Sequence, residues 1–240
     1  GAGASDSAMT QENAANKSRP LRTFGRTGGR GLSARQQSLI DTRLPELAVP
    51  TAADGTLSGR DLFGDDRDVW LEIGFGGGEH LVGQAGRNPD IGYIGCEPFI
   101  EGMAKALTGI EADQLQNVRL VMDDVRPVMA SLQDQSIARA FILFPDPWPK
   151  KRQQKRRLIQ PEFLESLHRI CRPGARVRFA TDVKSYADEA LLRFLRHGGF
   201  EWHANTADDW RCPPGDHLTT RYESKQLGDC APVWFDFVRS

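Results

Sequence analysis

Glycines and acids gather in a short segment, E-I-G-F-G-G-G-E (72–79), directly after an apolar run. Glycines between a strand and a helix let the backbone pass close to a nucleotide-like ligand, which points to Glu72, Gly74 and Gly76 as ligand contacts. A dinucleotide fingerprint needs a third glycine where Glu79 stands, and a carboxylate at a helix N-terminus repels a pyrophosphate. The spacing favours a cationic ligand without phosphates, such as S-adenosylmethionine. A tight turn with packing glycines is the alternative.

Acidic residues also stand at the ends of the next two apolar runs. Glu97 lies about 20 residues beyond the first glycines, where a carboxylate can accept hydrogen bonds from both hydroxyls of a ribose. Asp123 and Asp124 could hold an adenine amino group, and the spacing does not decide between them. Each acid taken singly could be a solvated loop residue. Acids at successive strand ends favour a shared ligand.

The fourth apolar run continues into P-D-P-W-P (145–149). Three prolines exclude a helix and hold the backbone in a fixed extended path, so that Asp146 is presented rigidly. Because ligands of an open α/β sheet bind beyond the carboxyl ends of its strands, we expect Asp146 to face the same crevice as Gly74 and Glu97. Trp148 offers a face on which a base could stack. A proline-stiffened turn with a core tryptophan is the alternative.

Basic residues concentrate in two places, although the net charge is only -1. The segment K-K-R-Q-Q-K-R-R (150–157) holds six cations among eight residues, a density typical of phosphate binding as well as of a solvated face. We expect phosphate contacts from Lys151, Arg152, Lys155, Arg156 and Arg157. Residues 17–43 hold seven cations and one acid, which predicts either a solubilising tail or a flexible arm that orders on a polyanion.

The elements that must position these residues alternate as in an α/β protein. Predicted strands are 69–73, 91–96, 118–122, 140–144, 177–180, 200–204 and 233–238, and predicted helices are 80–87, 101–111, 162–170 and 186–196. Residues 1–8 resemble a cloning remnant, 9–43 the flexible basic arm and 44–240 a single domain.

Composition excludes several classes of protein. With 240 residues, 39% hydrophobic and 26% charged, the chain is typical of a globular protein, and it has no apolar run long enough for a membrane span. We expect it in the cytoplasm. Its four cysteines show no C-x-x-C pair, so neither a metal site nor a disulfide framework is predicted.

Together these segments resemble the bacterial tRNA (guanine-N7-)-methyltransferase family. The matching stretches, from about residue 19 to the C-terminus, are R-P-L-R-T-F-G-R, L-E-I-G-F-G-G-G-E, G-C-E-P-F, F-P-D-P-W-P-K-K-R-Q-Q-K-R-R, A-T-D-V-K-S-Y-A and T-R-Y-E-S-K. The resemblance implies a Rossmann-like, mostly parallel seven-stranded sheet with helices on both faces and an antiparallel last strand. It also implies S-adenosylmethionine as methyl donor, S-adenosylhomocysteine as product and a guanine of the tRNA variable loop as acceptor.

The resemblance further implies roles for individual residues. Glu72, Glu97, Asp123 and Asp146 would bind the donor or lie against it, with Asp146 catalytic. Lys150, Asp182 and the stretch Thr220, Arg221, Tyr222 and Glu223 would contact the target nucleotide or the tRNA. Because guanine N7 carries no proton, it can attack the methyl group without a strong base, and Asp146 would position the base.

Three other functions remain open at this point. An amino-nitrogen RNA or DNA methyltransferase is one, because P-D-P-W is similar to the D-P-P-Y type of motif that holds an exocyclic amine. A non-catalytic RNA-binding protein on the same fold is another, and a nicotinamide dehydrogenase would share only the glycine turn. The residues do not distinguish a monomer from a homodimer and indicate no membrane or obligate protein partner.

Overall fold

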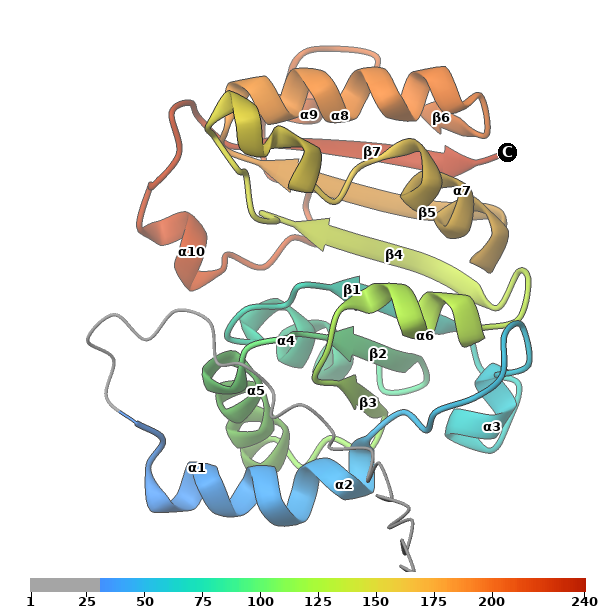
Figure 1. Cartoon of the computed structure of the whole chain (residues 1–240), viewed down its shortest axis with the longest axis vertical. Helices are drawn as coiled ribbons and strands as arrows, with labels where there is room; N and C mark the ends of the chain where they lie inside the picture. The colour runs from blue at the N-terminus through green and yellow to red at the C-terminus, as the bar shows by residue number, and fades with distance from the viewer. Residues whose placement is uncertain (1–30) are drawn as a thin grey trace, which may run out of the picture.

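The apolar runs form the strands of one seven-stranded sheet in a computed structural model that describes residues 31–240 (Figure 1). The strands are β1 (Val69–Ile73), β2 (Gly92–Cys96), β3 (Val118–Val121), β4 (Ile137–Leu143), β5 (Cys171–Thr181), β6 (Phe200–Trp202) and β7 (Val233–Arg239). Their order in the sheet is β3-β2-β1-β4-β5-β7-β6. Neighbours among β1 to β5 are parallel, whereas β7 runs antiparallel to both β5 and β6. The predicted α/β fold with an antiparallel last strand is confirmed.

Helices cover both faces of this sheet (Figure 1). One face carries α1 (Ala34–Ser38), the π-helical turn η1 (Leu39–Arg43), α2 (Leu44–Leu47), α4 (Glu79–Arg87) and α5 (Ile100–Ala112). The other carries α3 (Gly59–Phe63), α6 (Val125–Ser131), α7 (Pro161–Ile170) and α8 (Lys184–His197). Three short helices lie in connections: the 3-10 helix η2 (Lys151–Arg156), α9 (Asp208–Arg211) and α10 (Arg221–Ser224).

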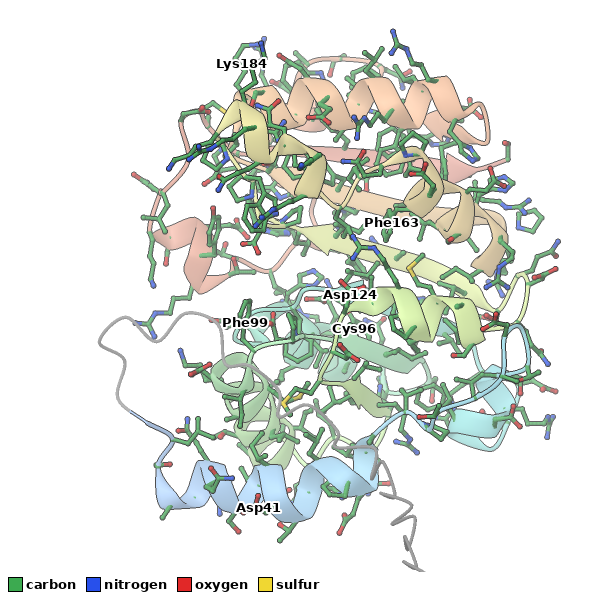
Figure 2. The ribbon with its side chains drawn as sticks, viewed as in Figure 1. Asp41, Cys96, Phe99, Asp124, Phe163 and Lys184 are labelled. Carbon is green, nitrogen blue, oxygen red and sulfur yellow. The ribbon has the colours of Figure 1, made fainter. Side chains whose placement is uncertain are left out.

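Alternation along the strands divides the core into two layers. Leu71 and Ile73 of β1 face the layer of α6 to α8, whereas Phe141 of β4 faces the layer of α4 and α5. Phe163 of α7 is buried in the first of these layers, while Asp41 and Lys184 are exposed and lie far apart on the molecule (Figure 2). Among residues 31–240, no helix combines the length and apolar character needed to cross a membrane.

Part of the predicted flexible arm is wrong. Residues 34–47 form a continuous helical segment whose first turn is capped by Ser33 in a capping box with Gln36. Its buried Leu39 and Leu47 pack on the layer of α5, and the segment ends in a bridge from Ala48 to β3. The sequence analysis missed this helix because charged residues separate the apolar residues that it buries. The rest of the arm and the predicted cloning remnant lie outside the described residues.

Candidate active site

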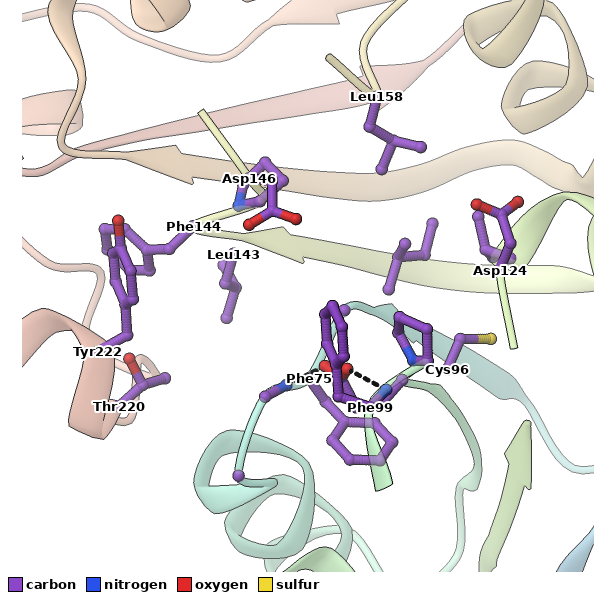
Figure 3. Close-up of a pocket in the computed structure, with 18 of the residues that line it drawn as sticks. Phe75, Cys96, Phe99, Asp124, Leu143, Phe144, Asp146, Leu158, Thr220 and Tyr222 are labelled. Atoms are coloured by element: carbon purple, nitrogen blue, oxygen red, sulfur yellow. Dashed lines mark hydrogen bonds between the residues drawn. The ribbon is translucent and has the colours of Figure 1, made fainter. Parts of the chain in front are cut away.

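A pocket of about 600 Å³ opens at the carboxyl ends of β1, β2, β3 and β4. Its volume lies within the range of ligand pockets in proteins, and its place is where open α/β sheets bind ligands. Its walls combine the glycine turn, the acids that follow β2 and β3, the P-D-P-W turn and α10 (Figure 3). Segments far apart in the chain therefore meet as the sequence predicted.

The glycine turn exposes its backbone to this pocket. Gly74 and Gly76 adopt φ values of 69° and 59°, in the left-handed region that other residues rarely enter, and nothing lies within 4 Å of the place where a Cβ would stand. Conformation, not packing, therefore requires these two glycines. Glu79 opens α4 and also lines the pocket, so that a negative charge stands where a dinucleotide site would hold a pyrophosphate.

Glu72 lies behind the glycine turn and outside the lining of the pocket. Its side chain is 2% exposed, and its Oε1 accepts a hydrogen bond from the Tyr93 hydroxyl at 2.7 Å and lies 2.6 Å from Nδ1 of His80. Burial and the Glu72 charge raise the pKa of Tyr93 well above its ordinary value, so the hydroxyl stays a donor. Glu72 thus ties β1 to α4 across the turn, and its direct contact with a donor stays a prediction.

Glu97 lines the pocket from the end of β2. Its Oε1 accepts the backbone N–H of Gly76 at 2.8 Å and its Oε2 accepts that of Phe99 at 2.9 Å (Figure 3). Burial raises the pKa of Glu97, these two hydrogen bonds lower it, and the charge of Asp146 raises it further. The same carboxylate that would receive ribose hydroxyls therefore also fixes the shape of the glycine turn.

Asp123 and Asp124 both line the pocket but differ in what their oxygens bond. Asp124 is the N-cap of α6: Oδ1 accepts the backbone N–H of Arg126 and Oδ2 accepts its guanidinium, both at 2.9 Å. Asp123 accepts only the backbone N–H of Asp124, at 2.7 Å on Oδ1. Within the described residues, Asp123 therefore keeps an oxygen for a ligand. The same D-V-R sequence signalled the start of α6, which the pattern analysis missed.

Asp146 faces the pocket from the turn after β4 (Figure 3). Solvent reaches it through the mouth of the pocket, but protein surrounds its carboxyl on other sides and this desolvation raises its pKa. The proline turn is not wholly extended, because Trp148 adopts a φ of 42°. Arg156 lies over the Trp148 ring at 5.1 Å, so one face of this indole is already covered. A base could stack only on the other face.

Comparisons with known proteins agree on one family. A family model described as "Putative methyltransferase" matches residues 66–234. The tRNA (guanine-N(7)-)-methyltransferase of Hyphomonas neptunium is 61% identical over 217 residues, covering 90% of this chain and 99% of the relative. The enzyme of the same name from Caulobacter sp. is 52% identical over 220 residues, covering 92% and 96%. The chain belongs to the tRNA (guanine-N7-)-methyltransferase family. The resemblance seen in the sequence is confirmed.

Two solved structures of other methyltransferases resemble the chain at low sequence identity, and this likeness shows the fold alone. The 16S rRNA methyltransferase KamB aligns with a TM-score of 0.54 at 17% identity, covering 79% of this chain and 99% of that one. The 16S rRNA (adenine(1408)-N(1))-methyltransferase from Catenulisporales acidiphilia gives 0.53 at 17% identity, covering 80% and 98%. The sequence relatives therefore show the family, and these two structures show the fold alone.

The residues that the family resemblance assigns to the acceptor fall into two groups. Thr220, Arg221 and Tyr222 line the pocket opposite the glycine turn, and the Tyr222 ring lies 5.6 Å from that of Phe144. Burial and the charges of nearby carboxylates, including Asp146, raise the pKa of Tyr222. Thr220 is also the N-cap of α10, and Tyr222 of this helix lies beside Phe144, on the same side of the pocket (Figure 3).

The second group of assigned residues lies outside the wall of the pocket. Glu223 completes the capping box of α10 and lies 2.7 Å from Nε2 of His217. Asp182 is 3% exposed, and its carboxylate accepts the backbone N–H of Gly228 at 3.0 Å. Lys150 is exposed just before η2. Glu223 and Asp182 therefore hold the chain around the acceptor side in place, and their contact with substrate stays a prediction.

One predicted phosphate contact is wrong. Arg157 is 1% exposed: it donates hydrogen bonds to Pro147 O at 2.7 Å, to Glu189 at 2.5 Å and to Ser185 Oγ at 2.8 Å. Its neighbours in the basic segment are exposed, namely Lys151, Arg152, Lys155 and Arg156. A count of charges along the sequence cannot separate the two environments, because burial depends on α8, which follows almost thirty residues later.

Several pocket residues were missed by the sequence analysis. Phe99 and Leu227 are large apolar side chains with 39% and 66% exposure, and both line the pocket, as do Lys105 and Arg126. An aromatic side chain exposed at a pocket, such as Phe99, is suited to stacking against a base or an adenine ring. For Phe99, its place two residues after Glu97 was a usable signal, whereas nothing in the local sequence marks Leu227.

Proposed function

We propose that this protein transfers the methyl group of S-adenosylmethionine to N7 of a guanine in the variable loop of tRNA. The observation that supports this most is the meeting of Glu97, Asp123 and Asp146 in one pocket of a chain that is 61% identical to an enzyme named for this reaction. The three carboxylates fit a donor that bears a positive sulfonium, ribose hydroxyls and an adenine amino group.

The donor side of the pocket would bind by backbone and carboxylate groups. The exposed backbone at Gly74 and Gly76 allows the amino acid portion to approach closely, and Glu97 would accept the ribose hydroxyls. Asp123 would accept the adenine amino group, because both oxygens of Asp124 already accept hydrogen bonds from Arg126. S-adenosylmethionine supplies an activated methyl on sulfur, which leaves as a neutral thioether.

The acceptor side would hold the guanine by Asp146. Its carboxylate can accept hydrogen bonds from the N1–H and amino group of the base, which places N7 in line with the methyl–sulfur bond. As the new N–C bond forms from the N7 lone pair, the C–S pair returns to sulfur and positive charge moves onto the purine. A carboxylate at this position stabilises that charge, and no proton leaves N7.

The test is to incubate the protein with S-adenosylmethionine and unmodified tRNA transcripts, then identify the methylated nucleoside and the RNA fragment that carries it by mass spectrometry. We expect 7-methylguanosine from the variable loop, absent with Asp146→Ala. A methylated amino nitrogen would instead show the amino-nitrogen class of enzyme. No product despite measurable donor and tRNA binding would contradict the proposal and favour a binding protein.

The exposed cations of the basic segment are proposed to grip tRNA phosphates while the base enters the pocket. Lys151, Arg152 and Lys155 are exposed and lie next to the P-D-P-W turn that carries Asp146. Binding of this kind is strongly salt-dependent because each neutralised phosphate releases counterions. Since N7 points into the major groove of paired RNA, the base has to leave the tRNA stack to reach Asp146.

A further inference from the structure

A pair of buried arginines holds the segment that brings α10 to the pocket, residues 212–232. The carboxylate of Asp216, near the start of this segment, accepts hydrogen bonds from Arg178 on Oδ1 and from Arg139 on Oδ2, each at 2.8 Å. Arg139 lies on β4 and Arg178 on β5, and their exposed fractions are 8% and 1%. We name these three residues the Asp216 bridge.

The arginines of the Asp216 bridge are themselves fixed. Arg178 also donates to Asp236 of β7, at 2.8 Å from Nε, and the Arg139 guanidinium lies 4.5 Å from the centroid of the Phe141 ring. Partial burial opposes ionisation of Asp216, but hydrogen bonds from Arg139 and Arg178 outweigh it and hold its pKa well below its usual range. The carboxylate is therefore charged at neutral pH and its anchors are rigid.

Helix α4 holds the same point of the segment. Gln84 donates from Nε2 to the backbone oxygen of Asp216 at 2.6 Å. Two residues further along, Leu218 sits so close to Gly83 that a Cβ on this glycine would come within 2.3 Å of Leu218 Cδ1. Because α4 begins at the glycine turn, the segment rests on the helix that also shapes the donor side of the pocket.

A short path leads from the Asp216 bridge to the acceptor side. His217, next to Asp216, lies 2.7 Å through Nε2 from Glu223, and Glu223 accepts the backbone N–H of Thr220 at 3.1 Å. This capping box sets the first turn of α10 and thereby the place of Tyr222 in the pocket. The other end of the segment is held at Asp182, through Gly228 N–H.

We infer that Asp216 is a positioning residue for methyl transfer: the Asp216 bridge fixes the 212–232 segment so that Thr220 and Tyr222 face Asp146 across the acceptor base. The inference rests on the proposed function. No member of the bridge lines the pocket, so its influence on the base passes through α10. A displacement of about 1 Å at a site that aligns reacting atoms can lower a rate on the order of 100-fold.

The chain offers a matched control for loss of a carboxylate bonded to arginine. Asp68 accepts two hydrogen bonds from Arg172, at 2.8 and 3.0 Å, with 44% side-chain exposure against 40% for Asp216. It precedes β1, at the end of the sheet away from the pocket. Asp68→Asn therefore removes a carboxylate of similar exposure from an arginine that does not hold the 212–232 segment.

The experiment compares wild type, Asp216→Asn and Asp68→Asn by donor affinity in calorimetry and by steady-state methylation of tRNA. We expect Asp216→Asn to lower kcat/KM for tRNA by about 10- to 100-fold while the donor Kd stays within about twofold. Asp68→Asn should leave both within about twofold. Equal kcat/KM values in the two variants would overturn the inference, as would parallel losses of donor affinity and methylation in Asp216→Asn.

A second variant and a second readout guard against simple misfolding. Gln84→Met removes the hydrogen bond to the Asp216 backbone and leaves all charges of the bridge in place; we expect the same pattern, with a smaller loss. Trypsin can cut the 212–232 segment after Arg221 and Lys225, which are exposed, and we expect faster cleavage there in Asp216→Asn than in Asp68→Asn. Equal cleavage rates in the two variants would refute the anchoring of the segment, whatever reaction the wild type catalyses. Absence of 7-methylguanosine with the wild type would refute the proposed function alone.

Discussion

At the scale of single residues, the environment of each carboxylate separates its tasks. Asp146 and Asp123 keep oxygens directed at the pocket, whereas Asp124 caps a helix and Glu72 joins His80 to Tyr93 below the surface. The residue type is the same or nearly so in all four. The four carboxylates differ in how many hydrogen bonds they already accept from the protein. A carboxylate with a free oxygen can bind a ligand, whereas one whose oxygens are bonded stabilises the fold.

The raised pKa of Asp146 gives a prediction for Asp146→Asn. The charged form is disfavoured by desolvation in the folded state, so this carboxyl favours folding in acid and that contribution is lost as the pH rises through its folded pKa. We expect Asp146→Asn at pH 7 to melt no lower than wild type while 7-methylguanosine formation falls at least about 100-fold. A lower Tm together with retained turnover would contradict both roles.

The same group predicts the acid limb of the pH profile. Because only the ionised carboxylate accepts from both N1–H and the amino group, kcat/KM for tRNA should fall as the pH drops through the raised pKa of Asp146. We expect this limb at a higher pH than an ordinary aspartate would give, measured with tRNA at fixed salt. The residual activity of Asp146→Asn should lack it.

Asp123 and Asp124 give a paired prediction. Asp124→Ala removes the N-cap of α6 and should lower the free energy of unfolding by about 1 kcal/mol, measured by urea denaturation. Asp123→Ala should leave stability within about 0.5 kcal/mol and weaken donor binding about tenfold in calorimetry. The reverse pattern would assign the adenine contact to Asp124.

At the scale of elements, η2 distributes one run of cations over different environments. Its Lys151, Arg152 and Lys155 point to solvent, Arg156 lies over Trp148, and Arg157 at its end is buried against α8. Arg157 follows η2 as its C-cap, and its extended backbone, with φ -58° and ψ 140°, takes its side chain out of the helical path of Lys151 to Arg156. Most cations of the basic segment therefore face the solvent, whereas Arg157 holds the P-D-P-W turn by its hydrogen bond to the Pro147 carbonyl.

This division predicts different outcomes for two neighbouring arginines. Arg157→Ala removes the donor to the Pro147 carbonyl and leaves Glu189 with Arg193 as its partner, and it should lower the free energy of unfolding by about 2 kcal/mol. Arg152→Ala should change it by less than about 0.5 kcal/mol but reduce the salt dependence of tRNA binding, lowering the log–log slope by about one. An unchanged slope would remove Arg152 from the phosphate contacts.

At the scale of the whole molecule, residues 34–47 have to be considered separately from the basic residues that precede them. Residues 34–47 pack on α5 and end at β3, so they are part of the domain. The five cations between residues 17 and 30 precede this docked helix and have no acid among them. Helix α5 begins three residues after Glu97. The helical segment 34–47 therefore packs on a helix that starts at the donor side of the pocket.

Deletion of residues 1–30 tests this arrangement. The shortened chain keeps Ser33 and the capping box of α1, so we expect its Tm and donor affinity to match the full chain. Its affinity for tRNA should fall, and the log–log salt slope should decrease by up to about four, because five cations are lost. Equal loss of donor and tRNA binding, or no loss of either, would reject the arm as a tRNA contact.

The sequence by itself determined the strands, their carboxyl-end acids and the glycine turn. β1 coincides with the predicted 69–73, because the apolar pattern of a strand is a local property of the sequence. Glu97, Asp123 and Asp146 meet in the pocket because each follows a parallel strand, and the carboxyl ends of these strands share one edge of the sheet. Glycine at positions 74 and 76 likewise permits the positive φ values found there.

Only the tertiary structure decided which charged residues are buried and what holds the acceptor side. Arg157 and Asp216 gain their roles from partners on α8 and on the β4–β5 pair, which are far away in the chain. Glu72 gains its role from His80, eight residues later, and from Tyr93 of the neighbouring strand β2. A charge looks the same in the sequence whether water or a buried partner satisfies it. The difference arises when folding removes the water, because a buried charge is stable only where distant segments bring it an opposite charge or hydrogen bonds.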